Sequence, residues 1–363
     1  MVKAKEIEGL NCDGSAAGEI RRVLSTRLEE MCALRAAALD WSDIEGVHDM
    51  RVASRRLRSA LRDFKPYLRE RPLGDVAVDL KRVADTLGAV RDQDVAIMAL
   101  EELQTEAPEE ISTGITELTD ERRTERETAR AVLTKTIGEE KLVRLRSDFG
   151  FALERATDLG RSHKRKKRTA AELSFSEAGR EIILARLEEL RDLSACLYRP
   201  FDTDALHEMR IAAKRLRYAM ELFASCWSEA LTEHAKEVAE LQTLLGDLHD
   251  ADVWLEGFGD MLRDFQKRQG VDDSASGGTS EQKRSAAVWL MRHFAKARMK
   301  HFGGALVRWH KWEAEDFFAQ LITSLDARPR ASVELSPVAL TASEAVASDI
   351  EAREPSDSAL SEA

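Results

Sequence analysis

Two sets of basic side chains recur at helical spacing, and their chemistry suits a polyanion. When the residues are projected at about 100° per residue, each set falls on one strip of its predicted helix, opposite an apolar strip. Arginine donates two hydrogen bonds to phosphate oxygens and keeps its charge, while lysine adds a point charge. The predicted contacts to a chain of phosphates are His48, Arg51, Arg55, Arg58 and Arg62 in the first set, and His207, Arg210, Lys214 and Arg217 in the second.

The two histidines begin their strips at matching positions, which favours contact with the ligand over a role as packed surface residues. Neighbouring cations should lower both histidine pKa values, so we expect neutral imidazoles until phosphate binds. Three residues beside the strips, Arg56, Arg215 and Tyr218, are further candidate contacts. We expect no catalytic residue in either strip.

Both sets belong to copies of one sequence pattern. Nine of the seventeen positions from His48 to Phe64 are identical in His207 to Phe223. A second shared block follows, in which residues 87–95 match residues 245–253. Two matching blocks in the same order indicate an internal duplication. Like charges three and four positions apart destabilise an isolated helix, so a bound polyanion explains the strips better than a solvated face does.

The elements that must position these side chains are amphipathic helices. Charged residues make up 33% of the 363 residues, aromatic residues make up 6%, and there are seven prolines. This composition is typical of an all-α protein. Pseudo-twofold packing of the two basic helices would place both strips across one basic central groove. We expect a first helical half at 16–161, a second at 170–325, and a disordered acidic tail at 326–363.

The net charge of −11 does not exclude a polyanionic ligand, because the acidic residues are clustered. Residues 101–127 carry a net charge of −7 and residues 326–363 carry −5, so the remainder is close to neutral. Screening limits each charge to about 8–10 Å, so a basic site can exist in an acidic protein. The basic run 164–168 is either a solvated linker or an extension of the anion track.

Cysteine spacing and hydropathy predict a protein of the cytoplasm. Cys12, Cys32, Cys196 and Cys226 are far apart and form no CxxC pair, so we expect no disulfide, no structural metal and a reducing compartment. No apolar run approaches the ~20 residues that span a bilayer, so we expect no membrane partner. No Gly-rich phosphate loop is present, and we expect no nucleotide or other cofactor.

Two other functions are open at this point. The first is a metal-dependent phosphohydrolase that uses Asp92, Asp94, Asp250 and Asp252, or a dyad of His249 and Asp250. Arg91 matches His249 in the repeat and cannot bind a metal, so we expect these aspartates to orient arginines of the basic helices instead. The second is a nucleic-acid binder, which is disfavoured because aromatic residues for base stacking are not interleaved with the cations.

The duplicated motifs resemble a known family. Residues 48–60 and 207–219 follow the pattern HxMRxAx[RK]RLRxA, and residues 87–95 and 245–253 follow LGxx[RH]DxDV. This combination resembles the conserved histidine α-helical domain, or CHAD, family over residues 16–325. The resemblance implies two helical bundles related by pseudo-twofold symmetry, with inorganic polyphosphate bound along a basic central surface. It also implies association with polyphosphate granules in some bacterial members.

The resemblance assigns contact roles to eight of the nine strip residues. Arg62 departs from the repeat because Glu221 stands at its matching position, so its role is less defined. Many relatives are joined to a triphosphate-tunnel β-barrel with catalytic carboxylates and lysines. Nothing strand-like is present in this sequence, so we expect a stand-alone binding module without hydrolase activity.

Overall fold

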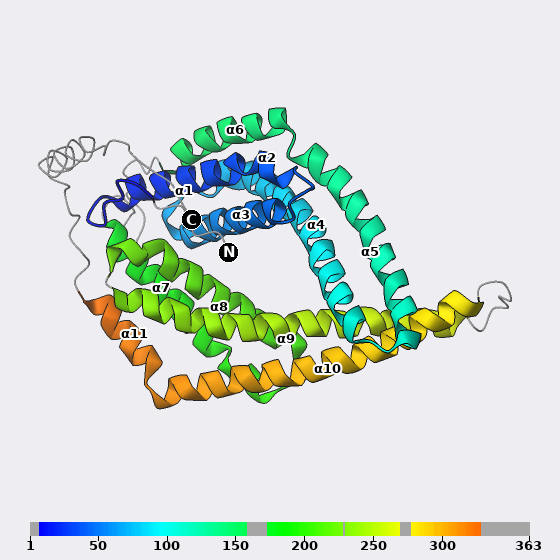
Figure 1. Ribbon diagram of the computed structural model, residues 1–363. Helices are drawn as coiled ribbons and strands as arrows, with labels where there is room; N and C mark the ends of the chain where they lie inside the picture. Colours follow the sequence, from blue (N-terminus) through cyan, green and yellow to red (C-terminus); the bar gives the residue numbers. More distant parts are fainter. Residues whose placement is uncertain (1–6, 158–172, 228, 269–276, 328–363) are drawn as a thin grey trace, which may run out of the picture. The chain divides into compact units, whose positions relative to one another are not determined.

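α-Helices make up almost all of the chain that the computed structural model describes, namely residues 7–157, 173–227, 229–268 and 277–327 (Figure 1). These ranges contain no strand, only an isolated bridge between Ser15 and Ser174. The predicted all-α fold is therefore confirmed. None of the described helices is long and apolar enough to cross a membrane. The basic run 164–168 and residues 328–363 of the tail predicted at 326–363 lie outside the described residues. Asp326, the first residue of that predicted tail, is helical and ends α11.

The order of helices in the first half recurs in the second (Figure 1). The order α1, α3, α4, α5, α6 matches α7 to α11, although the pseudo-twofold relation of the halves stays a prediction. The helices of the first half are α1 (Ala16–Ala33), α2 (Arg35–Ala38), α3 (Glu45–Asp63), α4 (Gly74–Glu106), α5 (Glu109–Thr136) and α6 (Glu139–Thr157). Those of the second half are α7 (Phe175–Asp192), α8 (Thr203–Phe223), α9 (Glu229–Arg268), α10 (Gly277–Ala314) and α11 (Phe317–Asp326). Short 3₁₀ turns lie at η1 (Lys65–Tyr67), η2 (Arg71–Leu73), η3 (Ser194–Tyr198) and η4 (Ala224–Cys226).

Side-chain hydrogen bonds cap the N-termini of α7 and of α8, the helix that carries the second basic strip. Ser174 Oγ accepts a hydrogen bond from the Glu177 backbone N–H, and the Glu177 carboxylate accepts one from Ser174 N–H, which together form a capping box for α7. Asp202 Oδ1 accepts a hydrogen bond from Ala205 N–H at the start of α8. These caps satisfy backbone donors that the first helical turn leaves unpaired. They define where α7 and α8 begin.

Apolar contacts between the halves hold the ends of the two basic helices together. Phe64 after α3 and Phe223 at the end of α8 occupy matching repeat positions, and their ring centroids lie 6.0 Å apart, edge to face. The ring of Phe175 from α7 lies 6.2 Å from Phe64 and 4.7 Å from Phe223. All three side chains are fully buried. Gly179 on α7 makes this packing possible, because a β-carbon there would lie 2.6 Å from the Phe223 ring.

The segments at the starts of α1 and α7 also pair through their backbones. Ala16 N–H donates to Leu173 O at 3.0 Å, and Phe175 N–H donates to Gly14 O at 2.9 Å. The two bonds exchange matching positions, since Phe175 corresponds to Ala16 and Leu173 corresponds to Gly14 in the repeat. The two segments therefore pair through equivalent positions, and each segment donates one hydrogen bond to the other.

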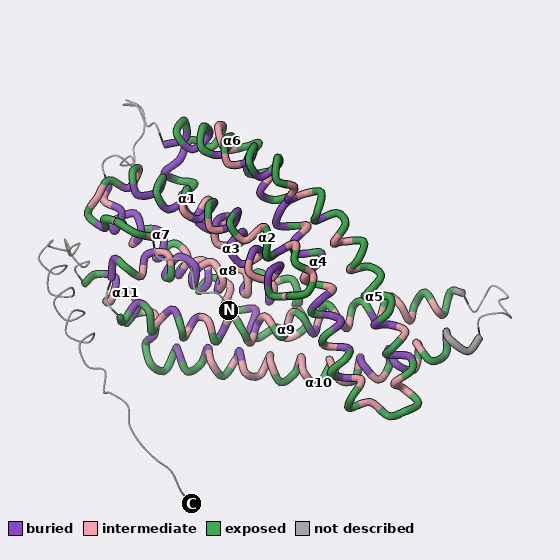
Figure 2. Tube along the Cα trace, turned by 45° about the horizontal axis from the view of Figure 1, so that its top comes forward, coloured by how far each residue is buried: buried purple, intermediate pink, exposed green. Residues whose placement is uncertain are grey.

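A second apolar cluster joins α4 and α5 to α9 and α10, and Figure 2 shows buried positions along these helices. The helices α5 and α10 approach closely at Gly114, where a β-carbon would lie 2.2 Å from Gln282 O. The halves thus contact each other at two separate places. The buried members of this cluster are Leu100, Leu103, Ile115, Leu118, Phe258, Ala286, Ala287 and Leu290.

Cys12 and Cys226 form a disulfide, so the expectation that no disulfide forms is wrong, and the reducing compartment inferred from it loses its support. The two residues are 214 positions apart, and only the tertiary fold brings the segment before α1 next to η4. No spacing rule for short disulfide frameworks detects such a pair. Cys32 and Cys196 are buried and free.

Candidate functional site

The basic strips lie on α3 and α8, whose apolar sides are buried in the core. Met50 and Leu57 on α3, and Met209 and Leu216 on α8, have 0% of their surface exposed. Burying a side chain of this kind contributes about 1.5–3 kcal/mol relative to leaving it exposed. Rotating either helix about its axis would lose this contribution. Each helix is therefore held with its basic strip on the side opposite its apolar side, although Arg217 of the second strip is also buried.

Most of the strip cations have no acidic partner. Arg51 pairs with Asp92, with 3.2 Å between Nη2 and Oδ1, and Arg217 pairs with Glu221, with 3.6 Å between Nε and Oε1. Within the described residues, the other cations have no carboxylate oxygen within 4 Å. Uncompensated positive charge therefore remains on both helices, at Arg55, Arg58, Arg62, Arg210 and Lys214.

The charges of the two strips act on one another across the halves. The pKa of Lys214 on α8 is lowered to about 8, first because burial disfavours its charged form and then because four arginines repel it. One of them is Arg210 on the same helix, and the other three, Arg51, Arg55 and Arg62, are on α3. The two strips therefore lie close enough for their charges to interact.

Arg55 on α3 is likewise affected by a positive charge on α8. Its pKa is lowered, first by burial and also by the positive charges of Arg51 on α3 and Arg217 on α8. Its Nε atom is buried and has no hydrogen-bond partner within the described residues. A buried donor without a partner costs about 1–3 kcal/mol. An anion that accepts a hydrogen bond from Arg55 would remove this cost.

The glycines of the second shared motif lie close to the first arginine of each strip. A β-carbon at Gly88 would lie 3.8 Å from Arg51 Nε, and one at Gly246 would lie 3.8 Å from Arg210 Nε. The motif glycine of each half thus lies beneath the first arginine of its strip. Asp92 Oδ1 accepts a hydrogen bond from Arg51 Nη2, as expected for an aspartate that orients a strip arginine. In the second half, Arg210 lowers the pKa of Asp250, but burial outweighs this effect and raises it overall.

The other two motif aspartates do not orient strip arginines, which corrects the expectation. Asp94 is buried, and its Oδ1 lies 3.5 Å from Nη1 of Arg126 on α5. Asp252 Oδ1 accepts a hydrogen bond from Arg298 Nε on α10 at 2.5 Å. Residues two positions apart on a helix point about 200° apart, so these aspartates face away from the strip. They join α4 to α5 and α9 to α10, so Asp94 and Asp252 do not converge with Asp92 and Asp250, whose charges act on each other.

The two histidines have different partners in the two halves. His207 Nδ1 lies 3.2 Å from His249 Nδ1. Burial and the charge of Arg210 lower the pKa of His249 to about 4. The pKa values of His207 and His48 are also lowered, chiefly by burial, and Arg91 adds to the effect at His48. Sequence reasoning missed Arg91 and His249 as neighbours of the strips, although their matching positions in the repeat were a usable signal.

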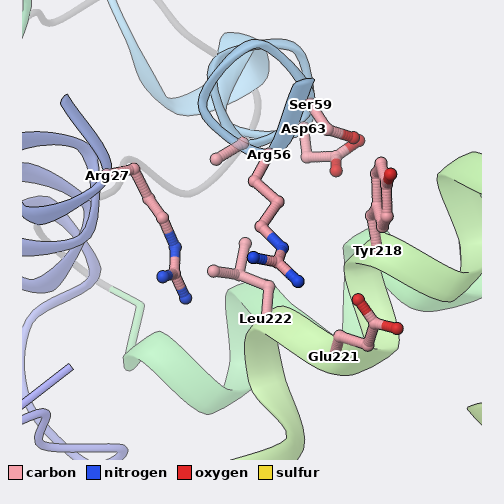
Figure 3. A pocket seen from close by; sticks show the side chains of 8 residues that line it. Arg27, Arg56, Ser59, Asp63, Tyr218, Glu221 and Leu222 are labelled. Carbon is pink, nitrogen blue, oxygen red and sulfur yellow. The ribbon is translucent and has the colours of Figure 1, made fainter. Parts of the chain in front are cut away.

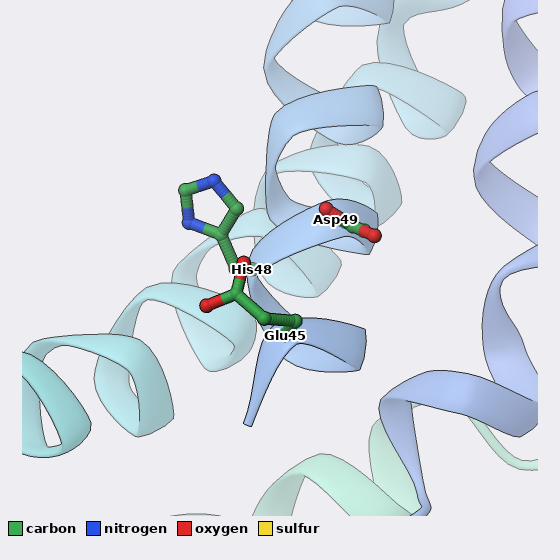
Figure 4. A group of neighbouring side chains, drawn as sticks. All are labelled: Glu45, His48 and Asp49. Atoms are coloured by element: carbon green, nitrogen blue, oxygen red, sulfur yellow. The ribbon is translucent and has the colours of Figure 1, made fainter. Parts of the chain in front are cut away.

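Within the described residues, one group of three side chains has ligand atoms close enough for a metal ion: Glu45, His48 and Asp49 (Figure 4). Their candidate atoms lie within 4.8 Å of one another. Glu45 is exposed, and its Oε1 lies 3.8 Å from Nη1 of Arg91. The guanidinium would repel a divalent ion, so we assign no metal to this group.

The three further candidates lie on the inner side of the strips. Arg56 contacts Glu30, and Arg215 forms an ion pair with Glu189. Tyr218 is buried, and the guanidinium of Arg217 lies 4.9 Å from its ring centroid. Arg56 and Tyr218 line a small pocket of about 30 Å³ between α1, α3 and α8 (Figure 3). These contacts indicate that the three residues position the basic helices.

The profile of the CHAD domain matches residues 22–258, a range that includes both basic helices and both copies of the second motif. The chain belongs to the CHAD family. A crystal structure of the CHAD domain from the plant Ricinus communis aligns with a TM-score of 0.58 at 22% identity, covering 91% of this chain and 99% of that one. PptA from Streptomyces chartreusis aligns with a TM-score of 0.56 at 16% identity, covering 81% of this chain and 99% of that one. At these identities the two structures support the fold alone.

Two curated relatives are uncharacterized proteins from two strains of Mycobacterium tuberculosis, 31% and 30% identical to this CHAD protein over 248 residues. The matched region covers 65% of this chain but only 44% of each relative. The relatives are therefore much longer than the region they share with it.

Proposed function

We propose that this CHAD protein binds inorganic polyphosphate along α3 and α8 and does not hydrolyse it. The observation that carries the proposal is the group of five strip cations that have no carboxylate partner within the described part of the chain. Both halves contribute to this group, and its charges act on one another. A flexible chain of phosphates supplies many negative charges in a row and needs no shaped pocket. Such a ligand offsets the repulsion between the strips and accepts hydrogen bonds from the arginine forks.

The ion pairs of Asp94 and Asp252 support the non-enzymatic part of the proposal. Asp94 and Asp252 are engaged with Arg126 and Arg298, so neither is available to share a metal ion with Asp92. Incubating the protein with polyphosphate and Mg²⁺ or Mn²⁺ should release no phosphate above the rate without protein. Sustained release would make it a phosphohydrolase.

Thermal unfolding tests the binding itself. A ligand that binds only the folded state at a hundredfold excess over Kd stabilises it by about 2.7 kcal/mol. We expect long-chain polyphosphate to raise the melting temperature at low salt, and orthophosphate at the same total phosphate to raise it far less. The absence of a shift with long chains would reject the proposal. A stronger shift with duplex DNA at equal phosphate would assign the strips to nucleic acid instead.

Binding of this kind would carry the protein to polyphosphate granules. Co-localisation of the tagged protein with stained granules should disappear in a strain that makes no polyphosphate. Granule localisation that persists without polyphosphate would require another receptor.

A further inference from the structure

A pocket of about 410 Å³ opens beside the first basic strip, where the end of α3 and the turn after it face the beginning of α4. Its volume falls in the range of roughly 300–1,000 Å³ that is typical of small-molecule sites. The pocket combines an apolar floor with a basic rim. A simple chain of phosphates would use only the rim.

The floor is made of aliphatic side chains. Leu68, Val76 and Leu80 are buried beneath it, and Leu61 is half-buried at its side. Covering apolar surface of this kind contributes about 25 cal/mol for each Å² removed from water. A ligand gains this contribution only if part of it is apolar.

The rim carries four cations, two of which have no carboxylate partner among the described residues. Lys65 Nζ lies 3.4 Å from a carboxylate oxygen of Glu70, and Lys81 pairs with an aspartate on its own helix. Arg58 and Arg62 also line the pocket and have no carboxylate within 4 Å among the described residues. They are four positions apart on α3, so both lie on the same side of the helix. Two arginine forks at this spacing suit one phosphate group.

The matching positions of the second half do not carry these charges. Glu221 replaces Arg62, and Ala224 stands at the position of Lys65. Arg217, which matches Arg58, contacts Glu221. The basic rim is therefore a property of the first half and does not follow from the repeat.

We propose that this pocket binds a phosphate monoester that carries an apolar chain. The phosphate contacts Arg58 and Arg62, and the chain covers Leu61, Val76 and Leu80. This site overlaps the end of the polyphosphate track at Arg58 and Arg62, and its apolar floor lies outside the track. Arg62 thus gains a role that the repeat does not assign to it.

Titration with decyl phosphate, kept below its micelle concentration and without polyphosphate, tests the proposal. Ala77 is exposed and lines the pocket, so Ala77→Trp fills the pocket without entering the core. We expect this variant to bind decyl phosphate at least tenfold more weakly. The matched control Val78→Trp adds the same side chain at an exposed α4 position outside the pocket and should bind normally. Equal affinity of Ala77→Trp and the wild type would overturn the proposal.

Three further ligands test whether both the phosphate group and the apolar chain are needed for binding. Decanol and orthophosphate should each bind at least tenfold more weakly than decyl phosphate, and equal binding by either one would overturn the proposal. Binding to phosphatidic acid vesicles without binding to monomeric decyl phosphate would assign the surface to a membrane and would overturn it as well. Ala77→Trp should keep its full affinity for polyphosphate, so failure of the pocket is distinguishable from failure of the proposed function.

Discussion

Arg55 on α3 and Lys214 on α8 repel each other across the boundary between the two halves, and this repulsion is one cause of the lowered pKa of Lys214. The first cause is the burial of Lys214. Both effects oppose a charged lysine in the unliganded protein. Functional sites often retain such unfavourable arrangements because the ligand relieves them.

Replacing Lys214 should therefore stabilise the protein while weakening its binding to polyphosphate. Near pH 7 the wild-type lysine is charged in both the folded and the unfolded chain, and the folded state carries the full penalty. We expect Lys214→Met to raise the melting temperature there by roughly 2–4 °C, the shift that about 1 kcal/mol gives in a large domain.

The stabilisation by Lys214→Met should depend on pH in a defined direction. Between the folded pKa of about 8 and the ordinary value of 10.5, the unfolded wild-type chain binds more protons than the folded one. Wild-type stability then rises with pH, and the advantage of the variant shrinks across this window. Thermal unfolding from neutral to alkaline pH measures the effect. A variant that is less stable than the wild type at pH 7 would contradict the account.

Replacing His249 by arginine, the residue at the matching position of the first half, should strengthen binding to polyphosphate. Arg91 stands at the matching position of the first half, so His249→Arg places a permanent cation beside Arg210. We expect tighter polyphosphate binding at neutral pH. Wild-type affinity should increase as the pH falls and the paired histidines take up protons. The affinity of the variant for polyphosphate should change less over the same pH range. Titration calorimetry at several pH values measures both affinities. An equally steep pH dependence in the variant and the wild type would argue against a role of the histidine pair.

Adding one methyl group to α7 should disturb the junction of the halves. Gly179→Ala would place a β-carbon 2.6 Å from the Phe223 ring, which is fully buried and has little room to move. Overpacking of this kind costs about 1–3 kcal/mol. Gly257→Ala is the control, because a β-carbon there meets nothing within 4 Å and should be neutral or slightly stabilising. Equal free energies of unfolding for the two variants, from denaturant titration, would show that the junction is loosely packed.

Reduction of the disulfide should lower stability without altering the strips. Cys12–Cys226 closes a loop of more than two hundred residues, and native disulfides contribute typically 2–4 kcal/mol. We expect a lower denaturation midpoint in reductant for the wild type, and none of this sensitivity in a Cys12→Ser, Cys226→Ser variant. Mass spectrometry of the oxidised protein should find Cys32 and Cys196 free, and a disulfide between other cysteines would refute the assignment.

Local and repeated features were predictable from the sequence, whereas contacts between distant segments were not. The strips, the helical class and the pairing of Asp92 with a strip arginine follow from helical periodicity and the two copies of the motif. The partners of Asp94 and Asp252 depend on where α5 and α10 pack, and these helices carry no repeat motif. The Cys12–Cys226 disulfide also depends on tertiary packing, because its two cysteines are 214 positions apart in the sequence.

The salt dependence of polyphosphate affinity tests the central claim most directly. By analogy with nucleic acids, each lost phosphate contact should reduce the slope of log K against log salt by about 0.7–0.9. We expect the combined variant Arg55→Ala, Arg58→Ala, Arg210→Ala to flatten the slope by about 2–3. The control is Arg82→Ala, Arg263→Ala, Arg284→Ala, which removes three exposed arginines that pair within their own helices and should leave the slope unchanged. An unchanged slope in the strip variant, or an equal loss in the control, would place the polyphosphate site elsewhere.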